Sequence, residues 1–390
     1  MWRDAIGRPA PTFIVLTLDH GLRAAAAGEA NTVAAAAAAL GLPVRILTRA
    51  AAPRQGGLQE QARNDRYRLL ADAARTAGAT AIATGHTAED QAETLLMRLA
   101  RGSGVDGLSA MSAISCYQDL SLLRPLLGVA KSQLKDFLAR HHVPWIEDPS
   151  NTDMSFERPR LRILMPQLAA AGLTAKALGR STTRLARARQ ALEAARREAD
   201  QRLTSVRSEG YVSIDRAGFE ALPEEIRLRV LQHWIGLIGN PCTPAPMAKL
   251  ERIVAASSAL ERYRSSIHYC LVSGTRERIL ISREPGRAGL PIETLQPGGM
   301  LVWDHRFRIT LPTDAIGAVV VRALQRADLV RDLAGLARKP SVPRAALFAS
   351  PSAWRAETLI ACPALGVMAE PLTFDLALPD PKAISAAGMV

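Results

Sequence analysis

The amino-acid sequence predicts an α/β protein that begins with a doubly wound parallel sheet and continues into a helical domain and a small α+β carboxy-terminal module. Three observations support this fold class. Short apolar runs alternate with helical patterns over the first half of the chain. A long arginine-rich helix follows without a strand signal, and the last part is β-rich and interrupted by Pro and Gly. Strands that alternate with helices favour a parallel sheet, because each helix carries the chain back to the sheet's starting edge.

In the first half, each strand is a short apolar run and each helix has an apolar and a polar face. We expect strands over 13–18, 44–47, 81–84 and 122–126, and helices over 24–40, 58–77, 89–99 and 131–141. Gly41 and Gly78 follow two of these helices, where glycine favours termination. Ligands of such sheets bind beyond the carboxyl ends of the strands, which is where Asp19 and His86 fall.

The second half begins with a helical pattern over about 174–206, and we expect a helical domain to continue to about Ala256 with a break at Pro241–Pro246. Strand patterns follow over 269–272, 278–281 and 301–311. The sequence therefore predicts three parts: a catalytic domain over 1–170, a helical linker and RNA-binding domain over 171–288, and an α+β module over 289–390.

The charge balance indicates a polyanionic partner. The chain has 49 basic and 37 acidic residues, a net charge of +12. Such a field attracts nucleic acid, the commonest polyanion. The alternative is a coding bias, since alanine and arginine are abundant and lysine is scarce. Charge alone does not decide between these two interpretations.

The four cysteines (Cys116, Cys242, Cys270 and Cys362) are far apart and form no CxxC pair. This spacing argues against structural zinc, an iron–sulfur centre or a disulfide framework, and we expect no protein-held metal. Neither a signal peptide nor an apolar run long enough to cross a membrane is present in the sequence. We therefore expect a cytoplasmic protein.

The most informative stretch is TGHTAEDQAET, residues 84–94. His86, Asp90 and Glu93 stand at i, i+4 and i+7, which predicts one shared helix face near the carboxyl edge of the sheet. Thr87 and Asp90 have the spacing of a capping box. Two carboxylates at such an edge can bind an ammonium group, ligate Mg²⁺ or accept protons. The alternative is a solvated first turn in which acids merely favour the helix dipole.

A glycine-rich loop, RGSGVDGL, follows at Arg101–Leu108. Glycines raise the entropy cost of ordering a loop, so their presence predicts that some group approaches the backbone closely.

Three segments in this order, LTLDHGLR (Leu16–Arg23), GHTAEDQAETLLMRLARGSGVDGLSAM (Gly85–Met111) and WIEDPSNTDMSFERPRLR (Trp145–Arg162), resemble the tRNA(Ile)-lysidine synthases. A weaker resemblance continues in PGGMLVWDHRFRITLP (Pro297–Pro312). This family belongs to the PP-loop ATP pyrophosphatases, and the resemblance implies their fold for residues 1–170.

The resemblance implies a definite reaction. ATP adenylates the C2 oxygen of the wobble cytidine in tRNA(Ile) with a CAU anticodon, and the ε-amine of free L-lysine then displaces AMP. The product, lysidine, changes codon specificity from AUG to AUA. ATP and Mg²⁺ are the implied cofactors. Two alternatives stay open: a non-catalytic tRNA-binding remnant, and another PP-loop tRNA-modifying enzyme. A cytidine thiolase would need cysteines for sulfur or a cluster.

The resemblance also assigns roles to residues. Asp90 and Glu93 match the family's lysine-binding carboxylates, and together with Arg158 they are the expected catalytic residues. The expected substrate-binding residues are His86, Asp148, Asn151 and Arg160, and the expected ATP-binding residues are Asp19, His20 and Arg63. The alternatives are a solvated surface for the arginines and a plain Asx turn for Asp19.

The long helix provides the candidate RNA contacts. Arg180, Arg184 and Arg187 repeat at i, i+4 and i+7 and can follow tRNA phosphates. A solvated helix between domains is the equally weighted alternative.

The chain departs from the family pattern in two places. Pro159 stands where the family commonly has Asn, and proline fits a helix's first turn. The SGGxDS loop and the strand before it, which is central in family sheets, are absent before Phe13. Unpaired buried backbone groups cost about 1–3 kcal/mol each, against a total stability of about 5–15 kcal/mol. We therefore expect a coding start some way upstream, and we do not expect the chain as written to turn over.

Overall fold

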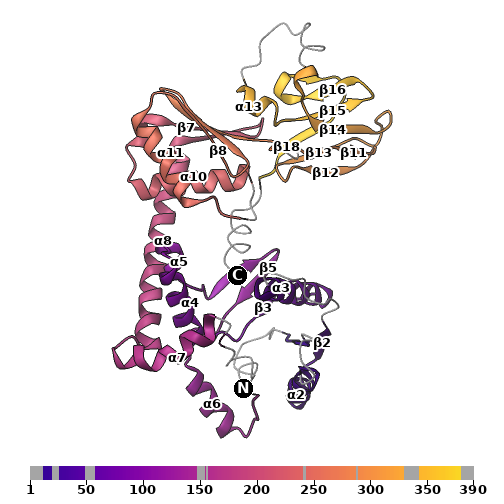
Figure 1. The fold of residues 1–390 in the computed structure, drawn as a ribbon. Coiled ribbons are helices and arrows are strands. Elements are labelled where there is room, and N and C mark those ends of the chain that lie inside the picture. The colour runs from indigo at the N-terminus through magenta and orange to yellow at the C-terminus, as the bar shows by residue number, and fades with distance from the viewer. Residues whose placement is uncertain are drawn as a thin grey trace. The chain divides into compact units, whose positions relative to one another are not determined.

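The computed structural model describes residues 12–19, 26–48, 58–146, 154, 157–239, 243–286, 289–328 and 342–378, without the side chains of 26 and 58–63 (Figure 1). Contacts divide the chain into two compact units, Met1–Arg189 (unit 1) and Gln190–Val390 (unit 2). Each unit is described by itself. The predicted division into three parts stays a prediction.

Unit 1 is a mixed α/β unit whose elements follow the predicted order (Figure 1). Its elements are β1 (Val15–Asp19), α2 (Ala26–Ala39), β2 (Val44–Thr48), α3 (Leu58–Thr76), β3 (Ala81–Ala83), α4 (Ala88–Ala100), α5 (Val105–Leu108), β4 (Ile114–Tyr117), β5 (Leu120–Leu123), α6 (Lys131–Arg140), α7 (Glu157–Ala170) and α8 (Ala175–Leu203), which runs on into unit 2. The two glycines predicted to end helices do so: Gly41 after α2 and Gly78 after α3 both have a φ of 68°. That left-handed conformation costs glycine little.

The strands of unit 1 form two separate sheets. β1 pairs with β2 in parallel, with Val15 opposite Val44, and β3 pairs with β5 in parallel, with Ala81 opposite Ser121. α3 contacts both β1 and β3. Among the described residues no strand pairs with both β1 and β3, so one continuous parallel sheet is not observed.

One predicted strand in unit 1 needs correction, and one strand was not predicted. The strand expected over 122–126 begins earlier, at Leu120, and it is preceded by β4, which the sequence analysis missed. β4 and β5 are antiparallel and joined by a tight turn at Gln118, whose φ is 55°. This hairpin is hidden in the sequence because its turn contains no glycine or proline, the usual signals.

α4 is held in unit 1 by apolar packing and by side-chain hydrogen bonds. Ala92 and Leu95 on α4 form a small buried cluster with Ala110 and with Leu178 of α8. Gln91 adds two hydrogen bonds to the backbone of Met111, donating to its carbonyl at 2.8 Å and accepting from its N–H at 2.9 Å. The helix that carries the predicted carboxylates is therefore held on a fixed support.

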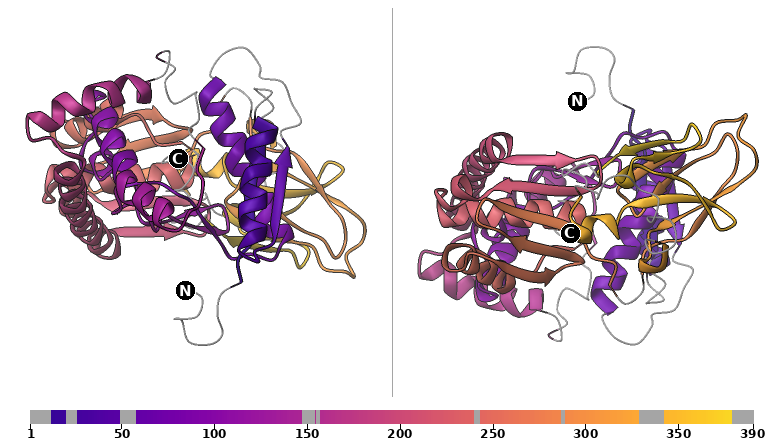
Figure 2. Two further views of the ribbon diagram at one scale, coloured as in Figure 1. Left: turned by 90° about the horizontal axis from the view of Figure 1, so that it is seen from below. Right: turned by 90° about the horizontal axis from the view of Figure 1, so that it is seen from above.

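Unit 2 contains the end of α8 and most of the strands. Its elements are β6 (Thr204–Arg207), β7 (Tyr211–Asp215), α9 (Arg216–Glu220), α10 (Glu224–Ile238), α11 (Met247–Ala259), β8 (Tyr263–Ile267), β9 (Cys270–Gly274), β10 (Arg278–Arg283), β11 (Glu293–Leu295), β12 (Met300–Trp303), β13 (Phe307–Thr310), β14 (Val319–Ala323), α13 (Arg344–Leu347), β15 (Pro351–Arg355), β16 (Thr358–Cys362), η3 (Pro363–Leu365), β17 (Val367–Met368) and β18 (Thr373–Leu376). The strands form sheets in the orders β6-β7-β10-β9-β8, β11-β14-β15-β16-β17 and β12-β13-β18. Figure 2 shows the first sheet's strands, coloured pink to orange, side by side.

The predicted helical domain up to Ala256 is wrong in part. α8 ends at Leu203, and β6 and β7 follow as an antiparallel hairpin. β7 then pairs with β10, so this region is a five-stranded sheet with α10 and α11 packed against it. Thr204 and Val206 are β-branched, and Gly210 takes a φ of 80° at the turn. These signals favour a hairpin, but an apparent continuation of the helical pattern masked them.

Candidate active site

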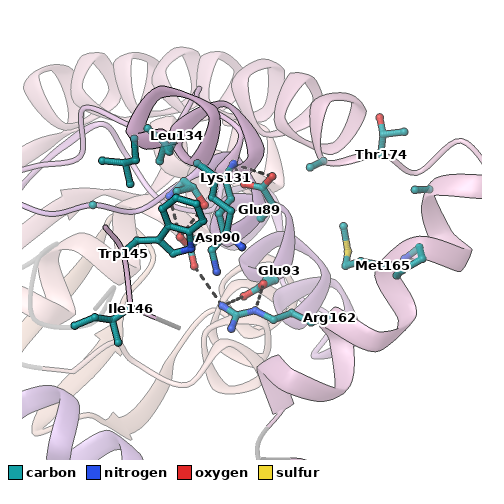
Figure 3. Close-up of a pocket in the computed structure, with 17 residues that line it drawn as sticks. Glu89, Asp90, Glu93, Lys131, Leu134, Trp145, Ile146, Arg162, Met165 and Thr174 are labelled. Atoms are coloured by element: carbon teal, nitrogen blue, oxygen red, sulfur yellow. Dashed lines mark hydrogen bonds and ion pairs between the residues drawn. The ribbon is translucent and has the colours of Figure 1, made fainter. Parts of the chain in front are cut away.

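A cavity of about 680 Å³ lies in unit 1 beside the start of α4 (Figure 3). Its acidic lining residues are Glu89, Asp90 and Glu93, its basic ones are Lys131, Lys135 and Arg162, and its larger apolar ones are Leu134, Leu138, Trp145, Ile146 and Met165. An apolar wall with a few charged groups is typical of a pocket for a small polar molecule with a hydrocarbon part.

The two carboxylate oxygens of Asp90 have different surroundings. Its Oδ2 accepts hydrogen bonds from the backbone N–H of Thr87 at 2.8 Å and from the Thr87 hydroxyl at 3.0 Å. This confirms the capping interaction that the Thr87–Asp90 spacing predicted. Its Oδ1 lies 3.6 Å from Arg158 Nη1 and 3.8 Å from Arg162 Nη2. The capping role therefore occupies only one oxygen, and the other faces cations.

Glu93 is the most buried acid of the cavity, with 2% of its side chain exposed. Arg162 Nε donates to its Oε1 at 2.6 Å, and Arg162 Nη2 donates to its Oε2 at 3.4 Å. Burial alone would lower the pKa of Arg162, but the hydrogen bond to Glu93 and the attraction of Glu93 and Asp90 raise it above its ordinary value. Arg162 is therefore a permanent cation beside two carboxylates.

α7 turns its arginines in two directions. Arg158 and Arg162 are four residues apart and face α4, and Arg158 Nη2 also donates to the Thr94 hydroxyl at 3.5 Å. Arg160 lies between them, is exposed and donates to the Met154 carbonyl at 3.4 Å. This split follows from helix geometry, since residues two apart point away from each other. Pro159 occupies the first turn of α7, as expected.

His86 does not share the helix face of the two acids. α4 begins at Ala88, so His86 lies in the preceding segment, where its Nδ1 is 2.9 Å from the Thr84 hydroxyl. His86 is also absent from the cavity lining. The expected i, i+4, i+7 face is thus corrected to a pair, Asp90 and Glu93, because the helix starts two residues after the histidine.

The other predicted site residues lie elsewhere or cannot be placed. Asp19 ends β1 opposite Thr48 and does not line the cavity. His20, Asp148, Asn151 and the side chain of Arg63 lie outside the described residues. Their predicted roles stay predictions.

Side chains of the same chain lie close to the glycine-rich loop. A Cβ on Gly107 would lie 2.5 Å from Ser103 Cβ, and Arg98 Nη1 donates to the carbonyls of Gly107 and Ala110 at 2.9 and 3.0 Å. Val105–Leu108 forms the short helix α5, and the loop does not line the cavity. Close internal packing explains Gly107, and Gly102 has a φ of 69°, whereas a Cβ on Gly104 would meet nothing within 4 Å.

Arg180, Arg184 and Arg187 are exposed on α8, and none forms an ion pair with another described residue. Leu178 and Thr182 on the same helix are buried. The three arginines thus form the solvent face that their spacing predicted, which suits both phosphate binding and a plain solvated helix.

Sequence reasoning missed two parts of the site. Arg162 was not singled out, although its i+4 spacing from Arg158 was visible and could have identified it. Glu89 accepts hydrogen bonds from the Lys131 backbone N–H at 3.0 and 2.9 Å, which ties α4 to the start of α6. No sequence pattern signals this contact, because the two residues are far apart in the chain.

Two further properties bear on the chemistry. Among the described residues, no group of three or more His, Cys, Asp or Glu side chains could hold a metal ion. Mg²⁺ commonly binds through one or two carboxylates and substrate phosphates, so it does not need such a group. No helix in the described ranges is long and apolar enough to cross a membrane.

Comparisons with known proteins identify relatives of the chain. The profile of a PP-loop domain family matches residues 3–168. A tRNA(Ile)-lysidine synthase of Ruegeria pomeroyi is 40% identical over 90% of this chain and 82% of the relative. One of Bradyrhizobium diazoefficiens is 46% identical over 65% of this chain and 72% of the relative.

Among solved structures, a U34-tRNA thiolase from Methanococcus maripaludis, described with its iron–sulfur cluster, covers 45% of this chain and 63% of its own. The identity is 13% and the TM-score is 0.38.

Proposed function

Because the chain belongs to the tRNA(Ile)-lysidine synthase family, we propose that it joins free L-lysine to C2 of the wobble cytidine in tRNA(Ile) with a CAU anticodon. ATP first transfers AMP to the C2 oxygen and releases pyrophosphate. The ε-amine of lysine then forms the C–N bond, and AMP leaves with the oxygen. This reading accounts for the acids of the cavity better than a non-catalytic remnant does.

The observation that carries the proposal is the paired carboxylate of α4, with Glu93 buried and Asp90 facing the same cavity. Two such groups suit lysine's ammonium, and Leu134, Leu138 and Met165 suit its methylenes. Only a neutral amine attacks carbon, and we propose that Asp90 accepts the proton that the ammonium loses. Arg158 and Arg162 supply positive charge for a carboxylate or a phosphate.

ATP is the second expected ligand, and Mg²⁺ is expected to arrive with its phosphates. We propose that Asp19, His20 and Arg63 contact the nucleotide and that His86, Asp148, Asn151 and Arg160 support substrate binding. Asp19 ends β1 at the carboxyl edge where nucleotides bind in open parallel sheets. We also propose that the protein is located in the cytoplasm.

The test is ATP-dependent incorporation of labelled lysine into a tRNA(Ile) transcript, measured with a form of the protein that carries the SGGxDS loop. We expect Glu93→Gln and Asp90→Asn to reduce incorporation at least about a hundredfold, since each removes a charge that holds the ammonium. Asp136→Asn on α6 is the matched control, because Asp136 is an exposed acid outside the cavity. Full activity of both site variants would refute the proposal.

The same assay tests the expected SGGxDS segment. We propose that turnover needs this phosphate-binding loop, and we expect product only from a form of the protein that carries it. Absence of product from both forms would favour the non-catalytic alternative.

We propose that Arg180, Arg184 and Arg187 contact tRNA phosphates. Charge reversal at Arg180 and Arg184 should weaken tRNA binding and reduce the slope of log affinity against log salt by about 0.9 per phosphate contact in a duplex region. A filter-binding titration at several salt concentrations measures both. Unchanged affinity would mean that these arginines form only a solvated surface and do not contact tRNA.

A further inference from the structure

One wall of the cavity comes from a single face of α6. Lys131, Leu134, Lys135 and Leu138 stand at i, i+3, i+4 and i+7 and all line the cavity, because residues with this spacing share one side of a helix. Trp145 follows α6 in the chain and also lines the cavity. Among the described residues it is the only aromatic side chain of the lining, and Figure 3 shows its indole there.

Trp145 combines exposure with a cationic neighbour. Its side chain is large and apolar, yet 45% of the residue is exposed. Lys135 Nζ lies 5.9 Å from the centroid of its ring. An indole offers a flat surface for stacking, and the ammonium beside it supplies charge for an anion. A nucleotide, which joins a flat base to a phosphate, has the two properties that this pair of side chains recognises.

The proposed reaction needs two ligands in one cavity. Reacting atoms must approach to about 3–3.5 Å, so C2 of the cytosine has to come within that distance of the lysine amine that Asp90 and Glu93 are proposed to bind. The cavity of about 680 Å³ has room for more than an amino acid, since pockets of about 300–1,000 Å³ hold drug-sized ligands. The cytosine must therefore enter this cavity, and the wall formed by α6 and Trp145 is the part of the lining suited to a base.

The adenine of ATP is the other base in the reaction, and its expected place differs. Once AMP is bonded to the C2 oxygen, a phosphate and a ribose separate the adenine from C2. Asp19, the proposed nucleotide contact at the end of β1, does not line the cavity. The cytosine carries the reacting carbon itself, so Trp145 is better matched to the cytosine than to the adenine.

We propose that the Trp145 indole stacks on the wobble cytosine and that Lys135 beside it contacts the phosphate of the same nucleotide. This inference rests on the proposed function. The wobble position lies in a single-stranded loop, and proteins that act on such a base turn it outward and stack it on aromatic side chains. Stacking covers one face of the cytosine and fixes the plane of its ring. The amine then attacks C2 from the opposite face, so Trp145 sets the orientation of the substrate.

The test compares the binding of tRNA(Ile) with a CAU anticodon and of the same tRNA with an abasic wobble position, in the form of the protein used for the incorporation assay. We expect the wild type to bind the intact tRNA about tenfold more tightly, a factor typical of one stacked base. In Trp145→Ala the two tRNAs should bind equally, and Trp145→Phe, which keeps a ring, should retain most of the difference. Phe137→Ala is the matched control, because Phe137 is an exposed aromatic residue of α6 outside the cavity lining, and it should leave the ratio unchanged.

The ratio of the two affinities separates a contact from a structural role. If Trp145 served only the fold, Trp145→Ala would weaken both tRNAs together and keep the wild-type ratio, and that result would overturn the inference. Circular dichroism checks that each variant is folded. Lys135→Gln should weaken both tRNAs alike and reduce the slope of log affinity against log salt by about 0.7, because an abasic nucleotide keeps its phosphate. An unchanged slope would overturn the phosphate contact.

Two further measurements distinguish the other outcomes. If Trp145→Ala weakened ATP binding at least about tenfold and kept the wild-type tRNA ratio, the indole would be assigned to adenine and the cytosine contact would be overturned. Lysine incorporation by the wild type, together with an unchanged ratio in Trp145→Ala, would overturn this inference alone. Absence of lysine incorporation by the wild type would overturn the proposed function and this inference with it.

Discussion

Unit 1 and unit 2 differ in how completely they bury their side chains. Of the twelve largest fully buried side chains in the described ranges, only Leu122 belongs to unit 1. The five residues of β1 are all half-buried, whereas Val212 and Ile214 of β7 are fully buried in the core under α10 and α11. Apolar burial is therefore concentrated in unit 2.

The difference reflects what each unit buries. Unit 2 closes five-stranded antiparallel sheets over apolar side chains, and its buried charges are paired. Unit 1 has two small sheets, and its cavity is lined by six charged side chains. Charged groups that recognise ligands do not contribute the burial that stabilises a core. We infer that unit 2 supplies most of the stability and unit 1 the chemistry.

The largest expected effect concerns the buried ion cluster of unit 2. Asp304 is 4% exposed and accepts from Arg306 at 2.8 Å and from Arg283 at 3.1 Å. Asp304→Ala would leave two guanidiniums unpaired, and we expect unit 2 to lose about 3–5 kcal/mol of unfolding free energy. Urea unfolding followed by tryptophan fluorescence measures the loss.

Arg276→Ala is the control for this prediction. It removes an exposed ion pair with Glu261, at 2.8 Å, and should cost less than about 1 kcal/mol. Equal losses in the two variants would mean that burial does not set the value of the Asp304 cluster.

A smaller effect compares strands of the two units. Ile214→Ala in β7 should cost about 2–5 kcal/mol, because it opens a cavity in a closed core. Leu16→Ala in β1 should cost less than half as much, since Leu16 is already half-exposed. Hydrogen exchange with mass spectrometry resolves each unit, and β1 amides should exchange faster than β7 amides. Slower exchange in β1 would contradict the comparison.

The smallest expected effect is a pH dependence of the stability of unit 2, to which two buried groups contribute with opposite signs. Burial raises the pKa of Asp200 from 3.8 to about 6, despite attraction by Arg196 and the hydrogen bond from Trp234. Its contribution to stability is therefore present below pH 3.8 and is lost as pH rises through 6. Burial, helped by Arg196, lowers the pKa of His233 from 6.5 to about 4. Its contribution is present above pH 6.5 and is lost as pH falls through 4.

Single variants separate the two groups. In His233→Gln only the contribution of Asp200 remains. The melting temperature of this variant should therefore fall, relative to the wild type, as pH rises from 4 to 6. In Asp200→Asn only the contribution of His233 remains. The melting temperature of this variant, relative to the wild type, should rise over the same pH range. Slopes of the same sign in both variants would contradict the assignment of causes.

Local patterns in the sequence predicted much of unit 1. The apolar runs and glycine stops located β1, β2, β3, α2 and α3 to within a few residues, because these signals act over one or two turns of chain. The β4–β5 hairpin and the β6–β7 hairpin were missed. The first lacks turn residues, and the second continues a helical pattern, so long-range strand pairing overrides the local signal.

The sequence by itself determined the family, the carboxylate pair of α4 and the cationic face of α8, since motif order and helical spacing are written in the chain. Only the tertiary structure decided that His86 leaves the helix face, that the glycine-rich loop packs on its own Arg98 and Ser103, and that Arg162 rather than Arg160 neutralises Glu93. These outcomes depend on where a helix begins and on which helix lies opposite it. Distances between elements remote in the chain fix both, and residue spacing does not encode them.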